Sequence, residues 1–264
     1  MSESLLSAHQ GPTLVLTLNR PLRRNALTVE MADALTAALV AADRDPDIRA
    51  IVLTGSAGHF CSGLDLQVAL EHADPSPEGR AMLVSRTLVG ALHPALLALS
   101  RCSKPTIGAL SGATVGFGLS LALACDLRLM GEDAYLSTQF VARGLFPDGA
   151  LMYQLERICG LGRALDLALR PDRRLTAIEA QSFGLSSRTV AAEGLLPDAL
   201  ALAHEVLRGA PLAQQHMKRL ARGEGLAAAL ATEVPAVVTC LQSEDATEGA
   251  MAFFEKRPPT FHGR

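Results

Sequence analysis

The order of the predicted elements constrains the fold of this chain more than any other feature of its sequence. Up to about residue 190, short apolar runs alternate with longer helical stretches. The runs 13–18, 50–53 and 106–110 are bounded by turn residues and predict buried strands. Strands that alternate with helices are typical of parallel pairing, so we expect an α/β core.

The first helix is predicted from a cap and an apolar stripe. Thr28 precedes Met31, Leu35 and Leu39, which are spaced as on one face of a helix. Thr28 is therefore the expected N-cap. Further helices are expected at 82–99 and 115–125, further strands at 126–130 and 135–137, and an exposed, mobile loop at 71–79.

The last third of the chain carries no strand signal. Successive helices are predicted at 196–207, 212–222, 226–240 and 244–254. We therefore expect two regions, a core over residues 1–194 and a helical region over residues 195–264.

Composition excludes several classes of function. The net charge of −3 argues against nucleic-acid binding, which needs an excess of Lys and Arg. Five scattered cysteines without a CxxC pair indicate free thiols in a reducing compartment. The N-terminus shows no secretory signal, and the apolar stretch 115–125 is too short to span a membrane. A cytoplasmic protein that binds neither nucleic acid nor membrane is expected.

Two glycine-containing segments have the features of backbone donor sites. In the first, FCSGLDL at 60–66, the turn at Gly63 can leave the Leu64 N–H pointing into a cleft. In the second, SGATVGFG at 111–118, Gly116 and Gly118 allow close approach at the start of an apolar helix, whose N-terminus carries unpaired N–H groups. Alone, the first motif is more typical of a tight strand-to-helix turn. The second is equally typical of a closely packed buried helix.

Together, two such backbone N–H donors can form an oxyanion hole. When a proton leaves the carbon next to a thioester, negative charge collects on the carbonyl oxygen. Fixed backbone donors stabilise that enolate, and the loss of one donor costs about 3–4 kcal/mol. Because no side chain is required, such a site can be built from glycine-rich backbone.

Four segments in this order and spacing give the chain a family resemblance. They are NRPLRRNAL at 19–27, the segment at 60–66, the segment at 111–126 and EGAMAFFEKR at 248–257, supported by Lys104-Pro105 and residues 177–184. The chain resembles the crotonase (enoyl-CoA hydratase/isomerase) superfamily over almost its whole length. The resemblance implies a spiral of ββα units over 1–194 and a C-terminal helical trimerisation region over 195–264. It also implies a homotrimer or hexamer.

The same resemblance implies an acyl-CoA substrate and no separate cofactor. The thioester oxygen would meet the amides of Leu64 and Phe117. Arg23 and Arg24 are candidates for the CoA phosphates, although a solvated basic turn is an equally good interpretation of this pair. The motifs assign the remaining substrate or CoA contacts to Ala26, Ser62, Gly63, Asp65, Leu66, Gly116 and Phe140. Asp65 is also expected to cap the helix that follows it.

The acid–base group departs from the hydratase pattern. The resemblance places the two glutamates of the family's hydratases at Ser120 and Phe140, and neither residue can activate water. Asp148 lies where several isomerase branches place their carboxylate, and its surrounding sequence is most similar to Δ3,Δ2-enoyl-CoA isomerases and the ring-opening isomerases of phenylacetate breakdown. Without that resemblance, Pro-Asp-Gly would simply indicate a turn. A nearby Phe140 would raise the pKa of Asp148 by making the pocket apolar.

The sequence therefore favours an enoyl-CoA isomerase that uses Asp148 as its acid–base group. A hydratase or another reaction of the superfamily is the first alternative. A non-catalytic acyl-CoA-binding protein is the second. No cluster has the spacing of metal ligands, so no metal is expected.

Overall fold

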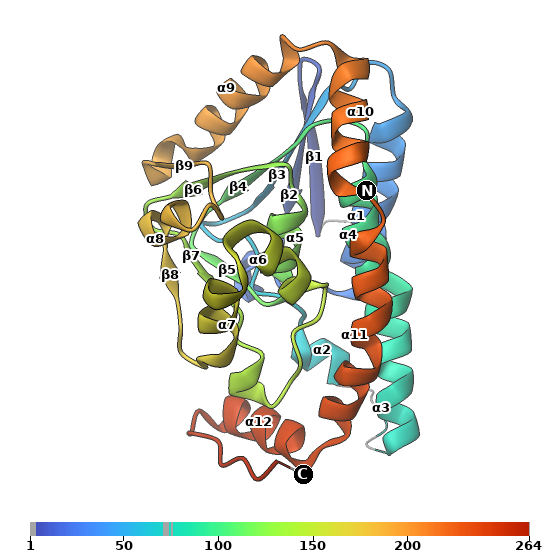
Figure 1. The fold of residues 1–264 in the computed structure, drawn as a ribbon, viewed down its shortest axis with the longest axis vertical. Coiled ribbons are helices and arrows are strands. Elements are labelled where there is room, and N and C mark those ends of the chain that lie inside the picture. Colours follow the sequence, from blue (N-terminus) through green and yellow to red (C-terminus); the bar gives the residue numbers. More distant parts are fainter. Residues whose placement is uncertain (1–3, 71–73, 75, 264) are drawn as a thin grey trace.

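The computed structural model describes residues 4–70, 74 and 76–263 and contains two sheets (Figure 1). The larger sheet has the order β1-β2-β3-β4-β6-β9 and the smaller one β5-β7-β8. The strands of the larger sheet are Leu5–Gln10, Thr13–Leu18, Ala50–Gly55, Thr106–Leu110, Leu127–Gly131 and Arg188–Val190. Those of the smaller sheet are Ala113–Val115, Tyr135–Ser137 and Leu175–Thr176. From β2 onward every pair in the larger sheet is parallel.

The expectation of an α/β fold with parallel pairing is confirmed, and the structure adds the strands β1, β5, β8 and β9. β1 pairs antiparallel with β2 as an edge strand, and the sequence analysis missed it because most of its residues are partly or fully exposed. β5, β8 and β9 were also missed. β5 lies in the segment interpreted as a glycine-rich turn, and all three strands are too short to show an alternating pattern.

The predicted helices of the core are present. Helix α1 spans Val29–Arg44, and the Thr28 side chain accepts a hydrogen bond from the Met31 N–H at 3.3 Å, as expected of an N-cap. α5 spans Phe117–Ala124 and is buried at every position. The other helices between the strands are α2 (Leu66–Leu70), α6 (Leu151–Cys159), α7 (Leu161–Leu169) and α8 (Ala177–Ser182), with short helices at Pro21–Arg23, Val141–Arg143 and Ala192–Gly194.

The expectation of a mobile loop over 71–79 is wrong at its C-terminal end. Ser76 accepts a hydrogen bond from the Gly79 N–H at 3.0 Å and caps α3, which spans Pro77–Val84. The helix continues through a π-helical stretch, η2 (Ser85–Leu92), into α4 (His93–Arg101). Ser76 followed by Pro77 is an N-cap with proline in the first turn, which is a typical helix start. The sequence analysis took the prolines of this segment as signs of a loop instead. Residues 71–73 and 75 lie outside the described residues.

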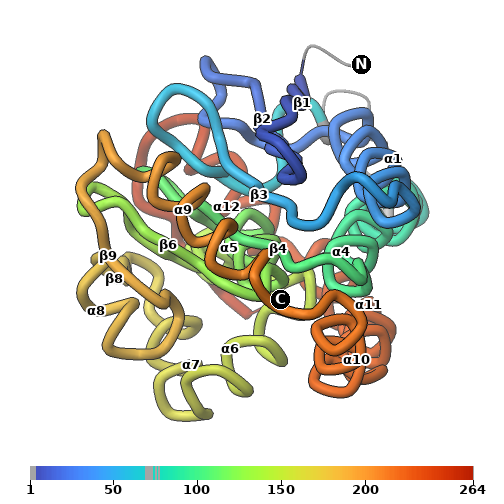
Figure 2. Tube along the Cα trace, turned by 90° about the horizontal axis from the view of Figure 1, so that it is seen from above, coloured from blue at the N-terminus to red at the C-terminus, as the bar shows by residue number. Residues whose placement is uncertain are grey.

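Four helices complete the chain, as predicted. They are α9 (Leu195–Leu207), α10 (Pro211–Arg222), α11 (Gly225–Gln242) and α12 (Glu244–Glu255). In Figure 2, α9 lies across one face of the larger sheet, while α10 and α11 stand beside α4. Leu195, Ala199 and Ala203 of α9 pack in one apolar cluster with strand residues such as Val52 and Ile107. The main apolar cluster lies on the opposite side and includes residues of α1, α4, α5 and α11.

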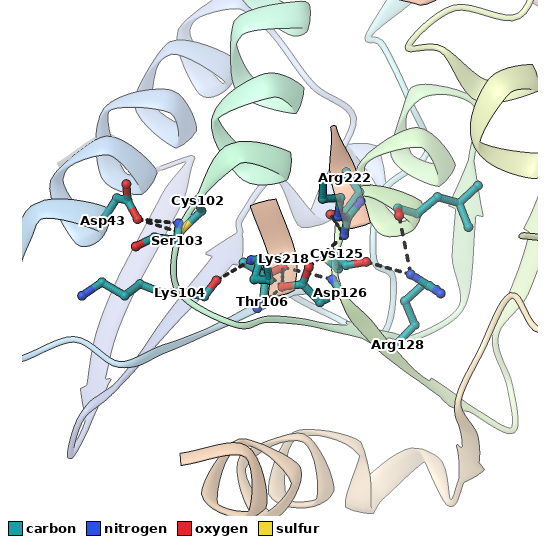
Figure 3. A network of polar contacts seen from close by, with 12 residues as sticks. Asp43, Cys102, Ser103, Lys104, Thr106, Cys125, Asp126, Arg128, Lys218 and Arg222 are labelled. Atoms are coloured by element: carbon teal, nitrogen blue, oxygen red, sulfur yellow. Dashed lines mark hydrogen bonds and ion pairs between the residues drawn. The ribbon is translucent and has the colours of Figure 1, made fainter. Parts of the chain in front are cut away.

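A polar network fixes α10 to the edge of the core (Figure 3). The Asp126 carboxylate accepts from both the backbone N–H and the hydroxyl of Thr106, at 2.8 and 2.9 Å. Its oxygens also lie 2.5 Å from Lys218 Nζ and 3.0 Å from Arg222 Nη2. Burial opposes ionisation of Asp126, but the two cations outweigh it and lower the pKa.

Two helical stretches, 78–101 and 211–242, are long and apolar enough to cross a membrane by length and composition. Half of the apolar window in the first is buried inside the protein, as in the core helix of a globular domain. The second is interrupted at Gly223, which has a φ of 55° between α10 and α11.

Candidate active site

The two glycine-containing segments meet in space. Cys61 and Thr114 form an isolated parallel bridge, and the Val115 N–H donates to the Cys61 carbonyl at 2.9 Å. Gly63 has a φ of 95°, and a Cβ atom there would lie 3.1 Å from the Val115 carbonyl oxygen and 3.4 Å from the Phe117 nitrogen. The turns at Gly63 and Gly116 are thus in contact, and this close approach requires glycine at position 63.

Two amides remain unpaired at this junction. Neither the Leu64 N–H nor the Phe117 N–H donates a hydrogen bond to any residue that the structure describes. The backbone groups on either side of the Leu64 N–H are hydrogen-bonded. The Gly63 carbonyl accepts from the Leu27 N–H, and the Asp65 N–H donates to the Leu27 carbonyl. Phe117 is the first residue of α5 and has no carbonyl one turn before it. The structure therefore brings together the two donors that the sequence singled out.

The turn at residues 148–150 is held by three side chains from three helices. The Ser120 hydroxyl of α5 donates to the Asp148 carbonyl at 3.1 Å. The Gln154 amide of α6 donates to the Gly149 carbonyl at 3.0 Å, and Glu233 of α11 accepts from the Ala150 N–H at 2.7 Å. Pro-Asp-Gly does form a turn here, and its backbone is fixed at each of three consecutive residues.

The Asp148 carboxyl is poised to hold a proton. The residue is buried, and its Oδ1 atom has no hydrogen-bond partner among the described residues. Burial raises the pKa of Asp148 well above its ordinary value, the negative charge of Glu233 raises it further, and the residue's own backbone N–H opposes both. The direction agrees with the expectation from the sequence. A carboxyl with a raised pKa can both accept and return a proton near neutral pH.

An apolar cavity of about 350 Å³ lies in front of this carboxyl. Leu64, Leu66, Phe140 and Asp148 line it, so the cavity connects the first donor segment to the acid. The rest of the wall is mainly apolar and comes from α3, η2, α11 and α12, with Leu83, Leu88, Val237, Leu241, Met251 and Phe254 among its residues. Such a cavity fits an apolar acyl group.

The sequence analysis missed Glu233 and His93. Both are buried, and Glu233 Oε1 lies 3.3 Å from His93 Nε2. A signal for Glu233 was present, because it occupies one position of the apolar stripe formed on α11 by Leu226, Leu230 and Val237. An acidic residue on the core-facing stripe of a helix indicates a buried charge with a partner.

The residues proposed for CoA binding surround the turn at 20–27. Arg23 and Arg24 are exposed, and Arg23 donates to the Gln67 side chain at 2.8 Å. The Ser62 hydroxyl donates to the Arg23 carbonyl, and Ala26 is buried beneath the turn. These contacts place the arginines at the surface next to the first donor segment.

Asp65 has a structural role. One oxygen accepts from the Val68 N–H at 3.3 Å, which confirms the predicted cap, and the other forms an ion pair with Arg20 at 2.8 Å. Arg20 also donates to the Ala26 carbonyl. This pair ties the turn at 20–27 to the donor segment, and the sequence analysis missed Arg20.

Metal binding and catalysis by a cysteine nucleophile have little support among the described residues. No three His, Cys, Asp or Glu side chains in that part of the chain are placed to hold a metal ion. All five cysteines are free, and burial raises the pKa of Cys61 and of Cys125 to about 12. Such buried thiols are poor nucleophiles.

Comparison with known proteins identifies the family of this chain. The family model for enoyl-CoA hydratase/isomerase matches residues 9–264. The enoyl-CoA hydratase EchA19 of Mycobacterium tuberculosis is 35% identical, with 98% of this chain and 96% of that protein covered. The peroxisomal Delta(3,5)-Delta(2,4)-dienoyl-CoA isomerase of Arabidopsis thaliana is 32% identical, with 93% and 91% covered. A crystal structure of an enoyl-CoA hydratase/isomerase from Pseudoalteromonas atlantica superposes with a TM-score of 0.86 at 32% identity, with 98% and 100% covered.

The fold and the family match define an acyl-CoA-processing enzyme with the crotonase fold. The chain belongs to the enoyl-CoA hydratase/isomerase family.

Proposed function

We propose that this enzyme isomerises the double bond of an enoyl-CoA with Asp148 as its acid–base group. The observation that carries the proposal is the buried Asp148 carboxyl with an unpaired oxygen at the wall of an apolar cavity that Leu64 also lines. The cavity supports an enoyl group that is predominantly hydrocarbon.

The reaction needs one carboxylate and two amides. Asp148 removes a proton from the carbon next to the thioester of a 3-enoyl-CoA. The electron pair moves into the thioester carbonyl, and the Leu64 and Phe117 N–H groups stabilise the resulting enolate oxygen. Collapse of the enolate shifts the double bond to the 2-position, and the protonated Asp148 returns the proton to the fourth carbon. Proton and charge balance without water or a second acid.

Hydration is the second candidate, because EchA19 is named a hydratase. Hydration requires a group that activates water. At the two positions where the resemblance places hydratase glutamates, the Ser120 hydroxyl is bonded to the Asp148 carbonyl and Phe140 is a buried ring. Neither can take a proton from water at neutral pH, so isomerisation is favoured over hydration. A non-catalytic acyl-CoA-binding protein is the third candidate.

Parallel assays separate these candidates. The wild type should isomerise a 3-enoyl-CoA and hydrate a 2-enoyl-CoA only slowly. Asp148→Asn should lower the isomerisation rate by about 10²–10⁴-fold, the usual effect of losing a general base. Its affinity for acyl-CoA, measured by calorimetry, should remain near wild type because the backbone donors are unchanged.

Asp172→Asn, an exposed change of the same chemistry, serves as the control and should be neutral. Efficient hydration by the wild type would favour the second candidate. Acyl-CoA binding without either reaction would favour the third. Wild-type isomerisation by Asp148→Asn would rule out the proposed base.

A further inference from the structure

We propose that Glu233, paired with His93, is the positioning residue of the Asp148 base: it fixes the turn that carries Asp148 and maintains a negative charge behind the carboxyl. This inference rests on the proposed function, in which Asp148 moves the proton. Glu233 lies in α11, which belongs to the C-terminal helical region rather than to the sheets that carry the donor segments.

Glu233 is hydrogen-bonded at one oxygen, and its other oxygen lies within ion-pair distance of an imidazole. Oε2 accepts from the Ala150 N–H at 2.7 Å, two residues after Asp148. Oε1 lies 3.3 Å from His93 Nε2 of α4, and neither atom forms a hydrogen bond with a described residue, including the other atom of this pair. The acid therefore joins three separate elements, α11, α4 and the turn before α6.

This arrangement is unfavourable for stability alone. A buried carboxylate loses its hydration, and its attraction to one imidazole repays that loss only in part. The same stripe of α11 is filled by Leu226, Leu230 and Val237, so an apolar residue at 233 would avoid the cost of a buried charge, although the Ala150 N–H would lose its acceptor. A buried ionisable group at the back of the site has the features of a functional group.

The charge of Glu233 acts directly on Asp148. Besides Asp148, the charged residues that line the cavity are Asp74, Arg80 and Arg143. Arg80 donates hydrogen bonds to the Leu241 carbonyl and the Thr247 hydroxyl, and Arg143 donates hydrogen bonds to Gln139. After burial, the charge of Glu233 is the main cause that raises the pKa of Asp148.

Glu233→Gln separates the effect of the negative charge from that of the hydrogen bond to the Ala150 N–H, which we call the clamp. The amide oxygen can still accept from the Ala150 N–H, but the negative charge is gone. A base is active when deprotonated, so kcat rises with pH through the pKa of Asp148. Removal of the nearby negative charge lowers that pKa and should shift the acid limb of the kcat profile to lower pH, with KM unchanged. Glu233→Ala also removes the clamp, and misplacement of the base should lower kcat by about 10²-fold.

The control for charge is Glu156→Gln on the exposed face of α6, which should leave the pH profile in place. Far-ultraviolet circular dichroism and thermal melting check that each variant is folded. An acid limb that stays at its wild-type position in folded Glu233→Gln would overturn the positioning role, even if the melting temperature changes. A merely structural role would move stability without moving the profile.

A second measurement does not depend on turnover. Aspartate labelled with ¹³C at the carboxyl gives a signal for each side chain, and Asp148→Asn identifies the one from residue 148. We expect the titration midpoint of that signal to move to lower pH in Glu233→Gln, and an unmoved midpoint would contradict the inference. If Asp148→Asn isomerises at the wild-type rate, the proposed function fails while the titration still decides whether Glu233 acts on Asp148.

Discussion

Asp148 illustrates what could be predicted at the scale of single residues. Its place in the chain indicated a role only through the family resemblance, because Pro-Asp-Gly by itself indicates a turn. The structure shows both, a fixed turn and a buried carboxyl with an unpaired oxygen. Glu233 could not be paired with it from the sequence, since it contacts Ala150 across 83 residues. A contact of that separation depends on how α11 docks, which local patterns do not encode.

Gly63 offers a test of the donor pair that leaves every polar group in place. A Cβ at this position would press on the Val115 carbonyl and reach the Phe117 nitrogen, and the φ of 95° is unfavourable for any side chain. We expect Gly63→Ala to lower kcat/KM by about 10²–10³-fold, as for loss of an oxyanion donor. Gly11→Ala is the matched control, because Gly11 has a φ of 59° with nothing within 4 Å. If both variants lose activity equally, strain rather than the donor pair explains the effect.

At the scale of elements, the sequence predicted those whose apolar pattern reflects their burial. The strands at 13–18, 50–53 and 106–110 are each buried over most of their length, and each was found. β1 was missed because an edge strand with exposed residues lacks that pattern. The contribution of α12 to the cavity was also missed, since Met251 and Phe254 reach it only after the helix docks.

We expect the ion pairs of Asp126 with α10 to stabilise the attachment of this helix to the core. Asp126→Asn should leave the cations of Lys218 and Arg222 without their anion and lower the free energy of unfolding by about 3 kcal/mol. The pKa of Asp126 is depressed in the folded protein, so its contribution is full above its unfolded pKa of about 3.9 and is lost as pH falls through the folded value.

Urea titrations at neutral and acidic pH measure this contribution. The difference between wild type and Asp126→Asn should shrink as the pH falls. The exposed pair of Arg101 and Glu224 supplies the control, because Glu224→Gln should change little. A variant as stable as the wild type at neutral pH would show that the network does not hold α10.

At the scale of the whole molecule, apolar side chains remain at the surface of several helices, among them α7 and α10. On α7 they are Leu161, Leu165 and Leu169, spaced by one helical turn, and on α10 they include Met217 and Leu220. Surface apolar residues that recur along one face mark an interaction site. Two different faces that bind each other between copies form a head-to-tail contact, which closes into a ring when the rotation permits. These faces support the trimer that the resemblance implied. The resemblance assigned trimerisation to residues 195–264, a region that includes α10 but not α7.

We therefore expect assembly through α7 of one copy and α10 of the next. Light scattering should give a mass three or six times the 27.8 kDa of one chain. A double change, Leu169→Glu with Leu220→Glu, places a charge on each face and should reduce the mass to that of smaller species, because burying unpaired carboxylates opposes association. Leu22→Glu, at a residue with 98% exposure on a different surface, should leave the mass unchanged. A wild-type mass of one chain at micromolar concentration would rule out the assembly. An undiminished mass in the folded double variant would move the interface to other helices.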